Sequence, residues 1–245
     1  MLSTFHLLLR KAGSGYRTLT GRDPASVREF LARHYLRGEG LEVGALDNPM
    51  PVSAGVKVRY VDRMIKEDLL RQYPELAGKK LVSIDIVADG EILEGIGNAS
   101  QDFIIANHFL EHCEDTVGTL KNFLRVLKSG GILFLSLPDK RFTFDRERVE
   151  TSYNHLLQDH REGPKGSRHD HFLEWVQYVE KEDESQRETE AARLSDMQYS
   201  IHFHVFTGPS MLAILGRLQD EQGLEFEVSA FQQNGQEFVC VLQKT

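Results

Sequence analysis

The sequence contains few cysteines and no long apolar run. Cys113 and Cys240 are its only cysteines, which excludes a disulfide framework and a cysteine-based zinc site and predicts a reducing, cytoplasmic location. No apolar run reaches the roughly 20 residues that cross a bilayer. The apolar stretch at residues 5–10 has no basic segment before it, unlike a signal peptide. We therefore expect no transmembrane segment.

An excess of positive charge is also absent. The 29 Lys and Arg residues are outnumbered by 37 Asp and Glu residues, which gives a formal net charge of −8. This balance argues against a nucleic-acid backbone as the main partner. With 40% hydrophobic residues, the chain can bury one sizeable core. We expect an N-terminal helical segment over residues 1–40 and one main domain over residues 41–245.

Short apolar segments alternate with helical patterns in the first half of the chain. Strands are predicted at residues 41–45, 56–61, 81–87, 102–107 and 132–137. A first helix is predicted at residues 24–37, with Asp23 as its N-cap. A second helix is predicted to end before Pro74, and a third covers residues 115–128. Strands separated by helices form a parallel sheet, and such a sheet binds its ligand at the carboxyl edge.

The pattern changes after the fifth strand. Residues 139–200 are polar and charged, with aromatic residues such as Phe144, Phe172 and Trp175 among them, and are predicted to form a helical insertion or lid. Thr207 then caps a helix over residues 210–222. Two further strands, at residues 224–231 and 237–242, are joined by a turn at Asn234 and Gly235.

The order of these strands and their turn residues resembles the class I S-adenosylmethionine-dependent methyltransferases between about Leu41 and Leu137. The resemblance rests on Glu42-Val43-Gly44-Ala45, Asp62, Asp89-Gly90, Asn107-His108-Phe109-Leu110-Glu111-His112 and Lys128-Ser129-Gly130-Gly131. It implies an α/β, Rossmann-like, seven-stranded, mostly parallel sheet with an antiparallel last strand. A helical insertion would follow strand five. It also implies S-adenosyl-L-methionine as the cofactor.

The first motif of the family is depleted in this chain. Glu42, Gly44, Ala45 and Leu46 occupy its positions, and a glycine there lets the backbone approach the cofactor closely. The connection over residues 45–55 is short for a crossover that contains a helix. We expect that helix to be missing or reduced, with the helix at residues 24–37 covering the same face of the sheet.

The resemblance implies cofactor contacts at the ends of the second and third strands. Asp62 would accept hydrogen bonds from the ribose hydroxyls, because a carboxylate is an acceptor only. Arg63 would pack over the adenosine. Asp89 and Gly90 would lie beside the adenine ring.

The segment from Asn107 to His112 has two interpretations. His108-x-x-Glu111-His112 fits a zinc-protease pattern, but a strand runs directly into His108, whereas that pattern needs one helix. On the resemblance, Asn107, His108 and His112 belong to the cofactor site. His108 is then the predicted general base, because its ordinary pKa of about 6.5 suits proton removal near neutrality.

Residues after the fifth strand are candidates for substrate binding. Asp139, Lys140 and Arg141 follow the strand at its carboxyl edge. In His202-Phe203-His204, alternation along a strand would put both histidines on one side, where they would bind substrate and compete with His108 as the base. Together with His169-Asp170-His171 they have a composition that ligates divalent metals. Substrate binding or packing is the favoured interpretation, and no metal site is predicted.

The predicted activity is O-methylation of a sugar or other small hydroxylated acceptor by direct displacement. The segments around His108, Asp139 and His202 resemble a bacterial subfamily that accompanies glycosyltransferases in surface-polysaccharide biosynthesis, which implies a glycan or small-molecule acceptor. One alternative is a catalytically silent methyltransferase-like binding domain. Another is a zinc hydrolase that uses His108, Glu111 and His112. The sequence leaves a homodimer open.

Overall fold

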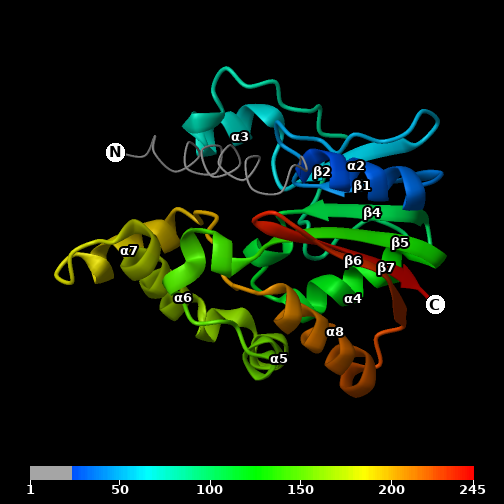
Figure 1. The fold of residues 1–245 in the computed structure, drawn as a ribbon. Coiled ribbons are helices and arrows are strands. Elements are labelled where there is room, and N and C mark those ends of the chain that lie inside the picture. Colours follow the sequence, from blue (N-terminus) through cyan, green and yellow to red (C-terminus); the bar gives the residue numbers. More distant parts are fainter. Residues whose placement is uncertain (1–23) are drawn as a thin grey trace.

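The chain folds around one seven-stranded mixed sheet (Figure 1). The computed structural model describes residues 24–245. The strands, in the order β3-β2-β1-β4-β5-β7-β6, are β1 Glu39–Val43, β2 Lys57–Asp62, β3 Ile86–Val87, β4 Gln101–Asn107, β5 Leu127–Pro138, β6 Phe226–Asn234 and β7 Glu237–Lys244. The first five pair in parallel, and β7 is antiparallel to both β5 and β6. The predicted fold class is confirmed.

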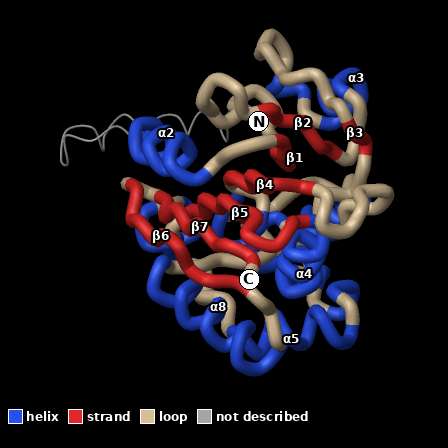
Figure 2. The backbone as a smooth tube through the Cα atoms, turned by 90° about the vertical axis from the view of Figure 1, so that its right-hand side faces the viewer, coloured by secondary structure: helices blue, strands red, loops and turns tan. Residues whose placement is uncertain are grey.

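Helices cover both faces of the sheet. They are α2 Pro24–Tyr35, α3 Lys66–Gln72, α4 Thr116–Val126, α5 Tyr153–Glu162, α6 Arg168–Trp175, α7 Arg187–Asp196 and α8 Gly208–Gln222. In Figure 2, α2 lies on the opposite side of the sheet from α4, α5 and α8. No helix of the described residues is long and apolar enough to cross a membrane. The predicted N-cap Asp23 lies outside these residues.

The first connection lacks a helix, as predicted. Residues 44–56 contain only turns and irregular backbone. On the face that such a helix would cover, Leu31 of α2 and Leu36 just after it pack with Met50 of the loop and with Phe103 and Phe134 of the sheet. Burying these apolar side chains stabilises the sheet, so α2 replaces the missing helix.

Residues close in sequence determine where α4 and α8 begin and where the turn between β6 and β7 lies. The side chain of Asp115 accepts a hydrogen bond from the Gly118 amide and begins α4, and Thr207 begins α8 with a capping box to Ser210. Gly235 has a φ of +66° in the turn between β6 and β7. Each of these features depends on neighbours in sequence, which explains why the sequence predicts them.

The predicted third strand is mostly wrong. Only Ile86 and Val87 form β3, although residues 81–87 were expected to be extended in the sheet. Leu81 instead packs with Leu69 of α3 and with Leu76. The Val82 amide donates to the carbonyl of Leu46, so this segment supports the loop after β1.

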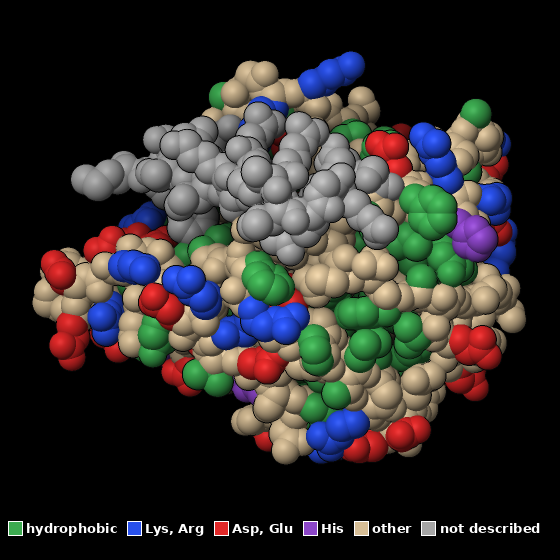
Figure 3. All heavy atoms as spheres, viewed as in Figure 1, with side chains coloured by type: hydrophobic (Ala, Val, Ile, Leu, Met, Phe, Trp, Pro, Cys, Tyr) green, Lys and Arg blue, Asp and Glu red, His purple; other side chains and the backbone are tan. Residues whose placement is uncertain are grey.

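The segment between β5 and α8 contains α5, α6 and α7 and has a small apolar core of its own. Phe172 and Trp175 of α6 pack there with Leu194 of α7, and with Ile201 and Phe203 of the chain before α8. Figure 1 shows α6 and α7 to one side of the sheet, and Figure 3 shows acidic and basic side chains interspersed there. The interpretation of this segment as a lid stays a prediction.

Candidate active site

A cavity of about 530 Å³ lies between the carboxyl edge of the sheet and the insertion. This volume is within the range of about 300–1,000 Å³ that is typical of small-molecule sites. From the strand ends and the turns after them, the cavity is lined by Val43, Gly44, Leu46, Asp62, Arg63, Asp89, Gly90, Glu91, His108, Phe109 and His112. From the insertion and the chain after it, the lining includes Phe144, Arg168, Phe172, Trp175, Ser195, Gln198, Tyr199, Ser200, His202 and Phe203.

The sheet end of the cavity contains hydrogen-bond acceptors and a backbone turn that a ligand can approach closely. Gly44 has a φ of +67°, and a Cβ there would lie 3.4 Å from the ring of Phe109, so the turn favours glycine. Asp62 is buried, which raises the pKa of its carboxyl, and the amides of Arg63 and Met64 donate to it and partly offset this. The side chain of Asp89 accepts from the Glu91 amide at 2.8 Å.

Arg63 connects the sheet edge to the end of the insertion. Its Nη2 donates to the hydroxyl of Tyr73 at 2.5 Å, and the guanidinium carbon lies 5.8 Å from the centre of that ring. The same Nη2 lies 3.5 Å from the carbonyl of Gln198. Because all three residues line the cavity, Arg63 spans it at one side.

Three predicted cofactor residues do not line the cavity. The carboxylate of Glu42 accepts from the Met50 amide at 2.9 and 3.1 Å, and burial raises the pKa of this carboxyl to about 7. Asn107 accepts from Ser136 Oγ at 2.9 Å, and the carbonyl of Ala45 accepts from the Asn48 amide. These groups hold the loop after β1 and the neighbouring strands in place.

His108 lines the cavity but is not a free base. Its Nε2 lies 2.5 Å from Glu237 Oε2, and its Nδ1 lies 3.5 Å from Glu111 Oε1. Burial lowers the pKa of the imidazole, but the two carboxylates outweigh burial and raise it to about 10. The side chain remains 39% exposed, which limits the effect of desolvation. A ring that is protonated near neutrality donates protons, so this geometry argues against the predicted role of His108 as general base.

The zinc-hydrolase interpretation is wrong in its geometry. His108 follows β4 with a φ of +49°, and the Leu110–His112 segment is only a short 3₁₀ turn. The two histidines therefore do not share one face of a helix, as the pattern requires.

His202 and His112 lie side by side at the insertion end of the cavity, with ring centroids 4.7 Å apart. His202 Nδ1 lies 2.7 Å from Asp145 Oδ2. His112 Nδ1 lies 2.8 Å from the carbonyl of Ile201, and burial, together with His202, lowers its pKa to about 4. Because carboxylates and carbonyls accept hydrogen bonds, Nδ1 of each ring carries a proton, and a ring in its neutral form presents Nε2 as an acceptor.

Buried Arg148 holds His202 and Asp145 in place. Its Nη1 donates to Asp145 Oδ1 at 3.0 Å and to the carbonyl of His202 at 2.7 Å, and its Nη2 donates to Glu174 Oε2 at 2.8 Å. A planar guanidinium with several fixed donors suits such a role. Arg148 therefore fixes both partners of the His202–Asp145 contact.

Four predicted substrate or catalytic residues do not reach the cavity, which corrects their assignment. His204 is fully buried, and its nitrogens contact Cys113 O at 3.0 Å and Asp159 Oδ2 at 3.1 Å. Asp139 is also fully buried and binds the guanidinium of Arg141. Lys140 Nζ donates to the carbonyl of Arg146. Residues 201–205 are not a strand, so His202 and His204 do not share a side.

Sequence reasoning missed several residues of the site. Asp145 and Glu237 lie 57 and 129 positions away from the histidines that they contact, and no local spacing indicates such pairs. The aromatic residues of the insertion were noticeable as isolated apolar residues in a polar segment. Of these, Phe144, Phe172 and Trp175 line the cavity.

Two groups of described side chains place possible metal-ligating atoms within 4.8 Å of one another. One comprises His155, Asp159, His171 and His204, and the other comprises Glu111, His112 and His202. Glu111 is fully buried, and neither of its carboxylate oxygens has a hydrogen-bond partner among residues 24–245.

Comparisons with known proteins agree with the fold. Residues 5–219 match a family model described as a methyltransferase domain. An uncharacterized protein of Methanocaldococcus jannaschii is 30% identical over 112 residues, which cover 46% of this chain and 50% of that protein. An L-seryl-tRNA(Sec) selenium transferase of Clostridium botulinum is 27% identical over 130 residues, which cover 49% of this chain and 28% of that protein. The chain thus spans half or less of the length of these curated relatives.

Two solved structures are similar to this chain at low sequence identity. A chain from the complex between the Trm112 methyltransferase activator and a methyltransferase of Haloferax volcanii has a TM-score of 0.50 and 8% identity, with 98% of this chain and 96% of that chain covered. A SAM-dependent methyltransferase from Aquifex aeolicus has a TM-score of 0.48 and 14% identity, with 97% of each chain covered.

The sheet end of the cavity fits the cofactor that this family uses. The buried carboxylate of Asp62 suits a pair of ribose hydroxyls, and apolar Leu46, Leu69 and Phe109 line the same cavity and suit an adenine ring. The family match covers most of the chain. The chain therefore belongs to the methyltransferase domain family, and S-adenosyl-L-methionine is its methyl donor.

Proposed function

We propose that the protein methylates a hydroxyl oxygen of a sugar or of another small hydroxylated acceptor. The observation that carries this proposal is the contact of 2.7 Å between His202 and Asp145 at the insertion end of the cavity. A hydroxyl keeps its proton near neutrality and needs a base as it attacks, whereas a neutral amine has a free lone pair. A histidine oriented by a carboxylate is a common form of such a base.

The bound methyl donor supplies an electrophilic methyl group. Asp62, Asp89 and the turn at Gly44, which line the sheet end of the cavity, would hold it there, and the acceptor would then occupy the insertion end beside His202. The Nδ1–H of His202 stays in its hydrogen bond to Asp145, so the lone pair of Nε2 can take the proton of the acceptor hydroxyl. Holding both reactants in one cavity lowers the entropic part of the barrier.

Phe144 and Trp175, which form an aromatic wall of the cavity, favour a sugar ring as the acceptor. Phe144 lies 5.0 Å and Trp175 lies 5.7 Å from the ring of His202, measured between centroids. Aromatic faces pack against the C–H faces of a sugar, while Ser195, Gln198 and Ser200 offer hydrogen bonds to hydroxyls. A role in surface-polysaccharide biosynthesis rests on the resemblance of the sequence alone. A cytoplasmic location and a homodimer also stay predictions.

The test has two stages. Calorimetry with S-adenosylhomocysteine comes first, and micromolar binding is expected; no binding at millimolar ligand would favour the silent domain instead. Transfer of a labelled methyl group to a panel of sugars and sugar nucleotides follows. We expect His202→Ala to abolish turnover while S-adenosylhomocysteine still binds, and His34→Ala, at an exposed position of α2, to behave as wild type. Methyl transfer only to amines would refute the proposed acceptor class.

A further inference from the structure

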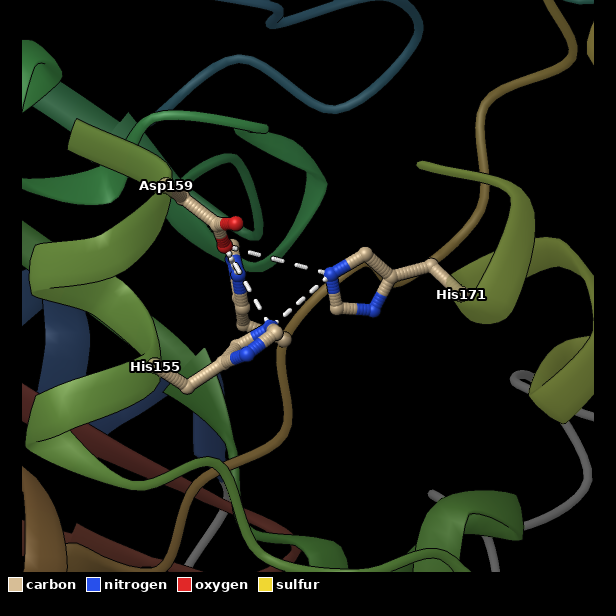
Figure 4. Close-up of side chains that lie close together, drawn as sticks. His155, Asp159 and His171 are labelled. Carbon is tan, nitrogen blue, oxygen red and sulfur yellow. Dashed lines mark hydrogen bonds and ion pairs between the residues drawn. The ribbon is translucent and has the colours of Figure 1, made fainter. Parts of the chain in front are cut away.

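Three histidines and an aspartate meet beside the cavity, where three segments of the chain come together. His155 and Asp159 are one turn apart on α5, His171 is on α6, and His204 precedes α8. One ligand atom from each lies within 4.8 Å of the others. Figure 4 shows His155, Asp159 and His171 pointing toward one another. None of the four residues lines the cavity.

The hydrogen-bond partners of His204 leave two acceptor atoms facing each other, and a positive charge between these atoms would stabilise them. Its Nδ1 lies 3.0 Å from the carbonyl of Cys113, which only accepts hydrogen bonds, and 3.2 Å from Thr116 Oγ1, which also can accept, so Nδ1 carries the proton of a neutral ring. Its Nε2 then presents a lone pair to Asp159 Oδ2, 3.1 Å away. Two acceptors this close in a buried place repel each other unless a cation or a proton lies between them.

The other side chains converge on the same carboxylate oxygen. The Nε2 atoms of His155 and His171 are 3.1 Å apart, so at most one proton fits between them. They lie 3.3 and 3.9 Å from Asp159 Oδ2. The other oxygen of Asp159 accepts a hydrogen bond from Ser167 Oγ at 2.6 Å. Ser167 thus orients the carboxylate and leaves Oδ2 for the cluster.

We propose that these four side chains bind one zinc ion. Zinc–nitrogen bonds of about 2.0–2.1 Å in a tetrahedron separate neighbouring ligand atoms by about 3.3 Å. Asp159 Oδ2 lies 3.1–3.9 Å from the three histidines, His155 and His171 are 3.1 Å apart, and all four ligand atoms lie within 4.8 Å of one another. Imidazole nitrogens favour zinc over magnesium or calcium, which take oxygen ligands. Protein atoms fill all four positions, so the site is structural and holds no reacting group. For the two His-x-His pairs the sequence favoured substrate binding or packing over a metal site, and each pair contributes only one residue, His171 or His204, to this cluster.

The zinc ion fixes the wall of the acceptor end. It ties α5 to α6 and to the chain before α8, and Phe172 and Phe203, each next to a ligand in sequence, line the cavity. Asp159 and His204 are buried, whereas the His155 side chain is 34% exposed. The ion therefore reaches the site from the side of His155.

The test measures metal content. Protein from zinc-supplemented cultures is passed through metal-free buffer and analysed by mass spectrometry of the elements, and stoichiometric zinc is expected. We expect His155→Ala and His171→Ala to lose it. His169→Ala is the matched control, because this exposed residue of α6 pairs with Glu188 instead, and it should keep the metal. Ser167→Ala should weaken zinc affinity about 10- to 100-fold.

Thermal unfolding provides a second measurement. Chelation should lower the melting temperature of the wild type and of His169→Ala, and added zinc should restore it, because a ligand of the folded state stabilises it. Substitution by Co²⁺ should give the visible absorption of a tetrahedral ion. A wild type without zinc, or a His155→Ala variant that retains it, would overturn the proposal. His155 is partly exposed, so this variant decides the matter even if His171→Ala does not fold. Binding of S-adenosylhomocysteine, measured in parallel, tests the methyltransferase function separately.

Discussion

Replacing Glu42 by glutamine tests what this residue of the first motif does. Its carboxylate is 1% exposed and accepts from the Met50 amide, and burial raises its pKa from 4.5 to about 7. A group with a raised folded-state pKa stabilises the fold fully below pH 4.5, and this stability is lost as the pH rises through about 7. The shift corresponds to about 3 kcal/mol, of which about 2.5 kcal/mol falls between pH 5 and pH 8.

Glutamine keeps the acceptor for Met50 but does not titrate. The absolute stability of Glu42→Gln depends on how its buried amide hydrogens are paired, so the informative quantity is the change with pH. Relative to the variant, the wild type should lose about 2.5 kcal/mol of unfolding free energy between pH 5 and pH 8. Urea unfolding followed by circular dichroism and by the fluorescence of Trp175, the only tryptophan, measures this difference.

The comparison also tests the predicted role of Glu42 in cofactor binding. Because Glu42 holds the loop and does not line the cavity, Glu42→Gln should bind S-adenosylhomocysteine as the wild type does. A stability difference between the two proteins that stays constant within about 0.5 kcal/mol from pH 5 to pH 8 would refute the reasoning about burial. A large loss of affinity without a change in stability would restore the role that the sequence suggested.

Three further outcomes follow from the site. Asp145→Asn should lower kcat for methyl transfer about 10²- to 10⁴-fold, with the affinity for S-adenosylhomocysteine unchanged. Glu174→Gln, which removes the other carboxylate that Arg148 binds, should keep most of the activity. Equal losses of kcat in both variants would contradict the role of His202 as a base oriented by Asp145. In urea unfolding, stability from His108 should be present below pH 6.5 and lost as the pH rises through about 10, and His108→Gln should remove this dependence, unlike His34→Gln at an exposed site. Asp62→Asn should weaken S-adenosylhomocysteine binding about 10- to 100-fold by calorimetry, and an unchanged affinity would remove Asp62 from the cofactor site.

The sequence predicts the features of this fold that depend on near neighbours. Asp115 and Thr207 mark helix starts because a cap bonds to amides within one turn. Strand β3 was overestimated because strand length depends on a partner elsewhere: Leu81 packs against α3 instead of extending the ladder. Apolar alternation alone does not distinguish these outcomes.

The candidate site shows the same division. Gly44, Asp62 and Asp89 were predicted to lie near one another because parallel strands end at one edge, and all three line the cavity. The prediction for His202 and His204 assumed a strand, and the chain there is irregular because long-range partners bind it. Arg148 donates a hydrogen bond to the carbonyl of His202, and the His204 amide donates to the carbonyl of Glu111.

This irregular segment joins the two proposed sites. His202 turns into the cavity toward Asp145, whereas His204 turns away from it toward Asp159. A regular strand would point both side chains the same way, so the break in the backbone is what allows one short segment to supply both a base and a metal ligand. The proposed ion would then be anchored two residues from the proposed base, and it would be held in part by α6, whose Phe172 and Trp175 line the cavity. The position of His202 relative to the methyl donor therefore depends on the packing of the insertion as well as on the sheet.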